Sequence, residues 1–344
     1  MIVFLQRRTN RAGAQVALSR LLTAPKLKAL DPLVIVQDDG WLTEQLRTQG
    51  VKVVVLTYPS TRSLTGTLWR NRAFVRNAAA SIGKPVAVIA NNHQEAWLAS
   101  EIGKATGSRS AVIIRDSYVT KEALEKYDWS TPDHALAVGC DLFNLASGSN
   151  DSVPVSPIYD ALLPEDFAEP KPKADRFPDR VLVIGSNHPM KGWSELQNAV
   201  HLACEIEPDL KRVRFDFTGN GSNVNGFNFV GHKAGFKNRV REYDLVINPS
   251  KSESFGLAAL ETLAAGVPLL STKVGVVGSL VPLPSELILP SEPDAMAKSL
   301  VAIFRSWSSI DPNVKKSQEC IRQFTPESSA ASVIDVVERM SLGE

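Results

Sequence analysis

The 344-residue sequence predicts an α/β protein built from two successive doubly wound domains. Three observations point to this fold class. The chain is longer than the size at which one hydrophobic core usually divides. Short β-branched apolar runs alternate with longer amphipathic stretches in both halves. A proline-rich segment interrupts this alternation near the middle of the chain. The hydrophobic fraction of 44% fits a chain that packs throughout.

The first domain is expected over residues 1–165, where apolar strands lead into helical stretches. The strands are predicted at residues 1–6, 33–36, 51–56, 86–90 and 111–114. Helices with apolar residues at helical spacing are predicted at 13–22, 41–48 and 94–106. Strands that alternate with helices in this way are typical of a parallel sheet with helices on both faces.

The interruption lies between positions 161 and 180, where four prolines stand among charged residues. Such a composition supports neither a helix nor a strand ladder, so residues 166–180 are predicted to be a linker. The second domain is expected at 181–325, with strands at 181–184, 214–217, 245–247 and 268–271. Residues 326–344 are predicted to form a final helix that either caps the second domain or packs back toward the first.

The ends and the cysteines exclude some classes of protein. The apolar start of the chain meets Arg7 at once, which makes it too short for a signal-peptide core or a membrane span. Cys140, Cys204 and Cys320 are widely separated and form neither a C-x-x-C pair nor a cluster with histidines. Neither a disulfide framework nor a zinc site is indicated. A cytoplasmic protein without a bound metal is therefore expected.

The net charge of +1 hides a basic N-terminal region. Residues 1–76 contain twelve lysines and arginines but four acidic residues. Such a region either lies against an anionic membrane surface or a phosphorylated acceptor, or is an ordinary solvated face. Aromatic residues are not interleaved with these charges as in nucleic-acid-binding modules, so no nucleic-acid partner is expected.

The most informative stretch runs from Asn248 to Pro268. A strand is predicted to end at Asn248, a polar loop follows, a helix begins near residues 254–256, and Gly266 ends that helix. The start of such a helix presents unpaired backbone N–H groups and the positive end of the helix dipole. Together these make an anion site suited to a diphosphate, and Gly256 lets the backbone approach it closely.

Glu253 and Glu261 stand on either side of this helix start. Their spacing covers at most about 12 Å if it is all helical. One carboxylate could then reach a donor sugar while the other accepts hydrogen bonds from a ribose. Acidic residues also occur at helix starts simply because the dipole favours them, and an N-terminal cap is the alternative role for Glu253.

The whole stretch resembles the signature of glycosyltransferase family 4, a retaining family of GT-B fold in which two glutamates are separated by seven residues. Thr262 is the one position off the pattern, where the family usually has Ala. The resemblance implies two Rossmann-like domains facing across a cleft, with a nucleotide-sugar donor on the second domain. It also implies that Glu253 positions the sugar, that Glu261 binds the donor, and that the helix start contacts the diphosphate through Ser254, Phe255, Gly256 and Leu257.

The loop after the first strand of the second domain is similar to the family's diphosphate-binding loop. It contains Gly185, Ser186 and Lys191. The resemblance implies that Lys191 neutralises the diphosphate and takes part in catalysis. Ser186 stands where the family has an arginine, and a hydroxyl does not replace that fork-shaped charge. His188 and Arg239 are candidates to compensate.

Three more segments are similar to donor-binding segments of the family. Gly219 lies in a strand-end turn, and Gly231 and His232 lie in the segment that borders the nucleotide base. In the first domain, Gly13 is similar to the glycine-rich loop beside the donor phosphates, although this loop has one glycine where two are usual. An ordinary strand-to-helix turn is the alternative role for Gly13.

Arg115 and His93 are the candidate catalytic residues of the first domain. Arg115 stands where the family commonly has a histidine that contacts the transferred sugar. His93 follows the strand 86–90, at a carboxyl end of the sort where α/β sites collect. A buried structural histidine or a helix cap is the alternative for His93.

The resemblance implies a metal-independent, retaining hexosyltransferase that uses a nucleotide-diphosphate sugar and no further cofactor. The basic N-terminal region predicts that the acceptor is a saccharide or lipid-linked acceptor of cell-surface polysaccharide biosynthesis. The expected location is the cytoplasm, with a peripheral position at the inner face of the membrane as a further expectation. The alternative is a catalytically inactive, glycosyltransferase-like binding or scaffold protein. Ser186 and Arg115 favour that alternative, whereas the presence of Glu253, Glu261 and Lys191 opposes it.

Overall fold

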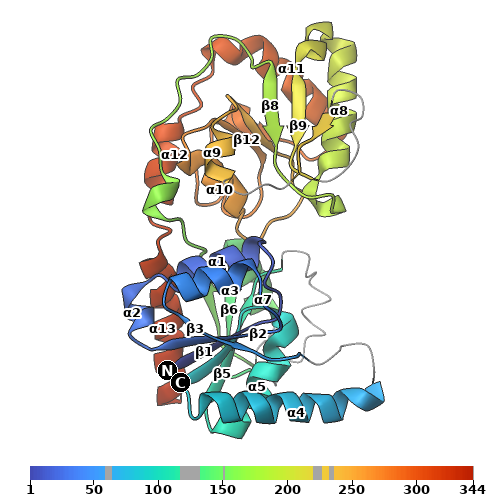
Figure 1. Cartoon of the computed structure of the whole chain (residues 1–344). Helices are drawn as coiled ribbons and strands as arrows, with labels where there is room; N and C mark the ends of the chain where they lie inside the picture. The colour runs from blue at the N-terminus through green and yellow to red at the C-terminus, as the bar shows by residue number, and fades with distance from the viewer. Residues whose placement is uncertain (59–63, 117–131, 150–151, 220–226, 232–235, 344) are drawn as a thin grey trace. The chain divides into compact units, whose positions relative to one another are not determined.

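The structure is a computed structural model that describes residues 1–58, 64–116, 132–149, 152–219, 227–231 and 236–343, without the side chains of 64–71 and 237. Two compact units form the chain (Figure 1). Unit 1 comprises Met1–Ala161 together with Phe324–Glu344, and unit 2 comprises Leu162–Gln323. Each unit has its own parallel sheet, which confirms the predicted fold class.

Unit 1 is built on seven parallel strands in the order β3-β2-β1-β4-β5-β6-β7. They are β1 (Ile2–Gln6), β2 (Pro32–Val36), β3 (Lys52–Val55), β4 (Ala87–Ala90), β5 (Arg109–Ile114), β6 (His134–Val138) and β7 (Val155–Ile158). The strands β1, β2, β4 and β6 are buried along their whole length, as expected for a sheet with both faces covered. The strand order reverses between β1 and β4, and loops that diverge at such a point leave a crevice that α/β proteins use for ligands.

The helices of unit 1 are α1 (Gly13–Leu21), α2 (Pro25–Lys28), α3 (Trp41–Thr48), α4 (Leu64–Ile82), α5 (Ala96–Thr106), α7 (Cys140–Gly148) and α13 (Pro326–Leu342). The last of these returns from unit 2 and packs against α1, α2, β6 and β7 (Figure 1). Val333 and Val336 lie on its buried face, and Thr325 caps it by accepting the Ser328 N–H over 3.1 Å. The C-terminal helix is therefore part of unit 1.

Unit 2 is built on six parallel strands in the order β10-β9-β8-β11-β12-β13. They are β8 (Arg180–Val183), β9 (Arg214–Phe217), β10 (Phe227–Phe229), β11 (Val246–Asn248), β12 (Leu269–Thr272) and β13 (Ile288–Leu289). Its helices are α8 (Trp193–Ile206), α9 (Phe236–Val240), α10 (Leu257–Ala264), α11 (Pro293–Ser306) and α12 (Val314–Ile321). Here the strand order reverses between β8 and β11. The loops after these two strands contain the predicted donor-binding residues.

The proline-rich segment 166–180, predicted as the linker, is packed on unit 2. The ammonium group of Lys171 donates to the carbonyl oxygen of Tyr243 over 2.9 Å, and that of Lys173 donates to the carbonyl oxygen of Trp307 over 2.7 Å. Phe177 is buried against the Trp307 ring at a centroid separation of 5.5 Å. The segment has no ladder of its own, so these side chains fix it to the unit.

Within the part of the chain that the structure describes, no helix is both long enough and apolar enough to cross a membrane.

Candidate functional site

Two loops meet at the carboxyl edge of the unit 2 sheet, where the strand order reverses. The loop after β8 leads through a short 3-10 turn to Lys191, and the loop after β11 carries Glu253. The ammonium group of Lys191 donates to Glu253 Oε2 over 2.8 Å, although the two residues are 62 positions apart in the sequence. The predicted catalytic pair of unit 2 is thus brought together by an ion pair between the two loops.

The carboxylate of Glu253 is held from two sides. Its Oε1 accepts a hydrogen bond from Ser250 Oγ over 2.8 Å, and its Oε2 accepts from Lys191. The side chains of Lys191 and Glu253 are 19% and 17% exposed, whereas Ser250 is fully buried. The residue that caps α10 is Gly256, so Glu253 is outside the cap position that was its alternative role.

The first turn of α10 begins directly after a left-handed residue. Gly256 has φ +87°, a conformation that favours glycine, and it lets the chain turn from the loop into the helix. The ring of the preceding Phe255 is buried, and its carbonyl oxygen accepts the Val276 N–H over 3.1 Å. Ser254 and Leu257 flank this turn and are partly buried. The start of α10 therefore has a fixed direction, as a diphosphate site at its N–H groups requires.

Glu261 lies in the second turn of α10 and is partly buried. Gly266 has φ +78° just beyond the end of the helix, as the sequence predicts for the residue that ends it. The role of Glu261 as the partner of a ribose stays a prediction.

The other donor-loop residues surround the same edge of the sheet. Gly185 is joined to β9 because its N–H donates to Thr218 Oγ1 over 3.0 Å and its carbonyl accepts from that hydroxyl over 2.7 Å. Ser186 Oγ accepts a hydrogen bond from the His188 N–H over 3.4 Å, which is a contact within its own loop. A methyl group on Gly219 would lie 2.4 Å from Asn187 Oδ1, which shows how closely these two loops pack.

The segment after β10 is described in part. The carbonyl oxygen of Gly231 accepts a hydrogen bond from the Arg239 guanidinium over 3.4 Å. His232, predicted to border the base, is outside the described residues. Arg239 is a candidate to replace the missing family arginine. Its guanidinium is hydrogen-bonded to the segment that is predicted to border the nucleotide base.

Arg115 of unit 1 is part of a buried polar network. Its Nε donates to Asn91 Oδ1 over 2.9 Å, and its guanidinium forms an ion pair with Asp160. The side chains of Arg115 and Asp160 are 6% and 11% exposed, and Asn91 in turn donates to Gln6 Oε1 over 2.6 Å. These contacts join the carboxyl ends of β1, β4 and β5 to the chain after β7, and a contact of Arg115 with a sugar stays a prediction.

His93 begins the 3-10 turn His93–Glu95 after β4. Burial lowers the pKa of its imidazole, with the charge of Asp116 opposing the shift, and this favours the neutral ring. The turn is capped by Asn92, whose Oδ1 accepts the Gln94 N–H over 3.0 Å, so His93 is not the cap. Its buried Nδ1 lacks a hydrogen-bond partner among the described residues.

Gly13 begins α1 and is exposed. A methyl group built on it would have no atom within 4 Å, and its backbone is not in the left-handed region. The local structure therefore does not require a glycine at this position. Its predicted contact with donor phosphates stays a prediction.

A polar hollow at the carboxyl edge of the unit 1 sheet was not predicted from the sequence. This cavity of about 480 Å³ is formed by the loops after β1, β2 and β4, and it is lined by Arg7, Arg8, Asn10, Gln37, Asp38 and Gln94. Glu95 is buried close by, and burial raises its pKa to about 7 against the opposing charges of Arg7 and Arg8. The adjacent arginines after the first strand were the sequence signal for this hollow.

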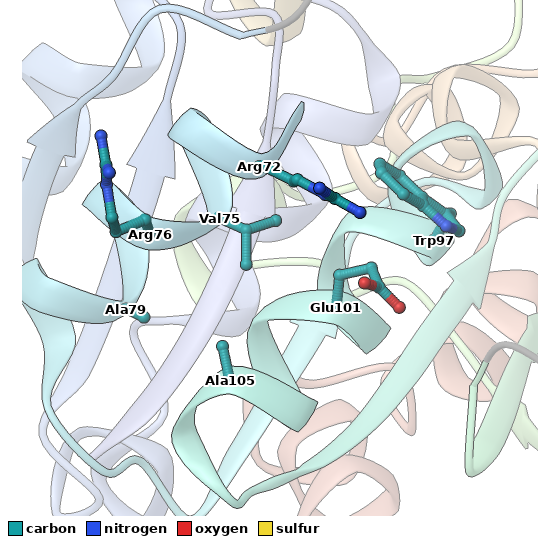
Figure 2. A pocket seen from close by; sticks show the side chains of 7 residues that line it. All are labelled: Arg72, Val75, Arg76, Ala79, Trp97, Glu101 and Ala105. Atoms are coloured by element: carbon teal, nitrogen blue, oxygen red, sulfur yellow. The ribbon is translucent and has the colours of Figure 1, made fainter. Parts of the chain in front are cut away.

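A second hollow of unit 1 lies between α4 and α5 and has a volume of about 440 Å³. Figure 2 shows Arg72 extending from α4 toward Trp97 and Glu101 of α5, whereas the Arg76 side chain, also from α4, points away from them. Its lining is more apolar than that of the first hollow and includes Val75, Ala79 and Ala105. None of the predicted site residues lines it.

Comparison with known protein families gives one match for unit 2. Residues 178–306 match the model of the family described as glycosyl transferases group 1. This segment begins just before β8 and ends with α11, so it contains the site formed by Lys191, Glu253 and α10.

Curated relatives are similar over part of their length. A GDP-mannose-dependent alpha-(1-6)-phosphatidylinositol dimannoside mannosyltransferase of Mycobacterium tuberculosis is 22% identical over 218 residues, which are 62% of this chain and 46% of that protein. The phosphatidylinositol N-acetylglucosaminyltransferase gpi3 subunit of Schizosaccharomyces pombe is 25% identical over 240 residues, 65% of this chain and 50% of the subunit. The chain thus spans about half the length of these relatives.

Solved structures resemble the whole chain. Anabaena Alr3699/HepE in complex with UDP and glucose has a TM-score of 0.77 and 17% identity, with 98% of this chain and 99% of that chain covered. Sucrose-phosphate synthase from Thermosynechococcus elongatus has a TM-score of 0.71 and 16% identity, with 100% and 99% covered. At this identity the likeness shows the fold. Residues 178–306 are thus similar to the group 1 glycosyl transferases, and the two α/β units of the chain have the GT-B fold.

Proposed function

We propose that this chain is a retaining glycosyltransferase that moves a hexose-type sugar from a nucleotide-diphosphate donor to a saccharide or lipid-linked acceptor. The observation that carries the proposal is the Lys191–Glu253 ion pair, which lies beside the start of α10 at the switch point of unit 2. The family match of residues 178–306 supports sugar transfer. The solved structure of HepE with UDP and glucose supports a nucleotide donor.

The donor diphosphate would lie at the N-terminus of α10, next to Lys191. Negative charge develops on the diphosphate as it leaves the sugar, and fixed dipoles and cations at that position stabilise the transition state. A lysine ammonium has three N–H groups, so Lys191 can hold Glu253 and a phosphate oxygen together. Because unit 2 offers these groups itself, we propose that no metal ion is required.

The two glutamates would hold the other parts of the donor. Glu253 is oriented by Ser250 and Lys191, so its carboxylate can accept hydrogen bonds from sugar hydroxyls in a defined direction. Glu261, inside α10, would accept from the ribose. The family arginine is absent at Ser186, and we propose that Lys191 and the helix start carry the diphosphate without it.

The acceptor proposal is broader. The names of the two relatives above refer to phosphatidylinositol dimannoside and to phosphatidylinositol, which supports a lipid-linked acceptor. We propose a role in cell-surface polysaccharide biosynthesis, performed in the cytoplasm at the inner face of the membrane. The basic N-terminal region supports this position, because anionic lipids attract such a surface.

Calorimetric titration with UDP, GDP, ADP and TDP tests the proposal. We expect one of them to bind the wild type, and Glu261→Ala to weaken that binding by about tenfold to a hundredfold, the effect of one hydrogen bond to a charged group. Glu205→Ala is the matched control, because Glu205 is an exposed helical glutamate on α8. No binding of any of the four at millimolar concentration would reject the transferase and favour the scaffold alternative.

A further inference from the structure

The polar hollow of unit 1 lies where the topology of the sheet favours ligand binding. The strand order reverses between β1 and β4, and ligands of open α/β sheets bind at the carboxyl edge beside such a point. Arg7 and Arg8 follow β1, and Gln94 follows β4. The hollow therefore lies at the switch point of unit 1, as the proposed donor site lies at that of unit 2.

The lining of this hollow is rich in hydrogen-bond donors. The guanidinium of Arg7 is oriented because its Nε donates to Gln37 Oε1 over 2.9 Å. Arg8 is exposed, and neither Arg7 nor Arg8 forms an ion pair with any carboxylate of the described ranges. The one acidic residue of the lining, Asp38, accepts from Thr9 Oγ1 over 2.6 Å. Two arginines thus face a cavity with a single acid to oppose them.

The nearest buried acid does not cancel this positive charge. Glu95 is 5% exposed, and burial raises the pKa of its carboxyl to about 7 although Arg7 and Arg8 act in the opposite direction. A carboxyl that holds its proton up to near-neutral pH contributes less than a full negative charge below that pH. The hollow therefore keeps a positive charge for a ligand.

We propose that this hollow binds a phosphate ester of the acceptor, so that the acceptor is a phosphorylated saccharide or a phospholipid-linked one. The proposal rests on the proposed function, since it assigns the acceptor class of that reaction. Arginine guanidinium groups present paired N–H donors that fit two phosphate oxygens, and they stay charged at all physiological pH values. Arg7 is pre-oriented by Gln37, and Arg8 would supply the second set of donors.

Arg8→Gln is the main test, and Arg76→Gln is its matched control. Arg8 is exposed, so its substitution is compatible with folding. Arg76 is an exposed arginine of α4 that lines a different hollow of the same unit (Figure 2). Glucose 1-phosphate and inorganic phosphate are titrated into each protein by calorimetry at constant ionic strength. The quantity compared is the affinity lost on substitution of Arg8, because the residues of α10 are identical in all the proteins titrated.

We expect Arg8→Gln to weaken glucose 1-phosphate binding by about tenfold or more, as the loss of a charged hydrogen bond predicts. Arg8→Lys should bind glucose 1-phosphate with an intermediate affinity, because lysine keeps the positive charge but lacks the paired N–H groups of the guanidinium. Arg76→Gln should bind as the wild type does. Equal binding by wild type and Arg8→Gln, or a loss in Arg76→Gln alone, overturns the proposal.

Vesicle flotation identifies the source of the phosphate. Arg8-dependent binding to phosphatidylinositol vesicles, and not to phosphatidylcholine vesicles, would assign the site to a lipid headgroup. Arg8-dependent binding of glucose 1-phosphate without vesicle binding would assign it to a soluble acceptor. Nucleoside diphosphate binding is measured on the same proteins. A chain that binds the nucleotide but shows no Arg8 effect rejects this inference alone, whereas a chain that binds no nucleotide rejects the transferase.

Discussion

The variant Lys191→Met tests two effects of the Lys191 ammonium group. One is the stability of the folded unit 2, and the other is the binding of a diphosphate. Methionine keeps much of the length of lysine and removes the ammonium group, which leaves Glu253 with Ser250 as its hydrogen-bond donor. The ion pair has an N–O distance of 2.8 Å, and both side chains are about four-fifths buried. Its loss should therefore weaken both the folded state of unit 2 and the binding of a diphosphate.

The burial of the pair sets the size of the stability effect. Exposed ion pairs contribute about 0.2–1 kcal/mol, and removing one partner of a fully buried pair costs about 3–5 kcal/mol. A pair of intermediate burial should then cost about 1–3 kcal/mol on loss of the lysine, which lowers the melting temperature of a unit of this size by roughly 2–10 °C. Nucleoside diphosphate binding should weaken by about tenfold to a hundredfold.

The double variant Lys191→Met/Glu253→Gln distinguishes the two effects. It removes the unpaired carboxylate, so we expect it to melt above the single variant Lys191→Met. It does not restore the ammonium group, so nucleotide binding should stay weak. Scanning calorimetry with and without the nucleotide gives both quantities. A double variant whose loss of stability equals the sum of the single losses would refute the coupling, and unchanged nucleotide binding in Lys191→Met would refute its role at the diphosphate.

Four other predictions concern stability, pH and metal. Since burial raises the pKa of Glu95 to about 7 from 4.5, the folded state keeps a proton that the unfolded state loses, and the free energy of unfolding should fall as the pH rises from about 4.5 to 7. Glu95→Gln should flatten this slope in urea unfolding at pH 5 and pH 7, and an unchanged slope would reject the shift. Gly192→Ala should prevent unit 2 from folding stably, because at φ +65° its methyl group would lie 1.9 Å from the Pro249 carbonyl oxygen. Gly256→Ala, at φ +87°, would bring its methyl group to an ordinary contact with Glu253 Cβ at 4.0 Å and should cost about 1–2 kcal/mol. Equal melting temperatures of these two variants would contradict the close contact predicted at Gly192. Arg115→Gln should destabilise unit 1 by about 3–5 kcal/mol by leaving a buried carboxylate unpaired, and a melting curve identical to that of the wild type would show that the pair is not structural. Sugar transfer should continue in EDTA, and activity that returns only on addition of Mg²⁺ would contradict a metal-independent reaction.

The regular part of the fold was predictable because its signals are local. Strands such as β2 and β4 are continuous apolar runs, and buried parallel strands require that composition. The strands β6, β7, β10 and β13 were not predicted. The edge strand β7 contains Pro157, which an edge tolerates, and β13 has two residues. Such short or interrupted segments become strands through pairing with a neighbour, which a single sequence does not display.

The candidate site was predictable where it is built from one segment. The end of β11, the loop after it and the helix α10 follow from the local order of residues in 248–268. The Arg115–Asp160 pair joins residues 45 positions apart, and no local pattern pointed to it. The structure places the Arg115 guanidinium in a buried network, and the sugar contact implied by the resemblance stays a prediction. Tertiary pairing of this kind depends on strand order, which the sequence alone did not provide.

The decisive measurement is a crystal structure of the chain with whichever nucleoside diphosphate it binds. We expect the β-phosphate to lie within hydrogen-bonding distance of the backbone N–H groups at the start of α10 and of the Lys191 ammonium group. The ribose hydroxyls should face Glu261. A nucleotide whose phosphates lie in the Arg7–Arg8 hollow of unit 1, or away from α10 on unit 2, would contradict this expectation.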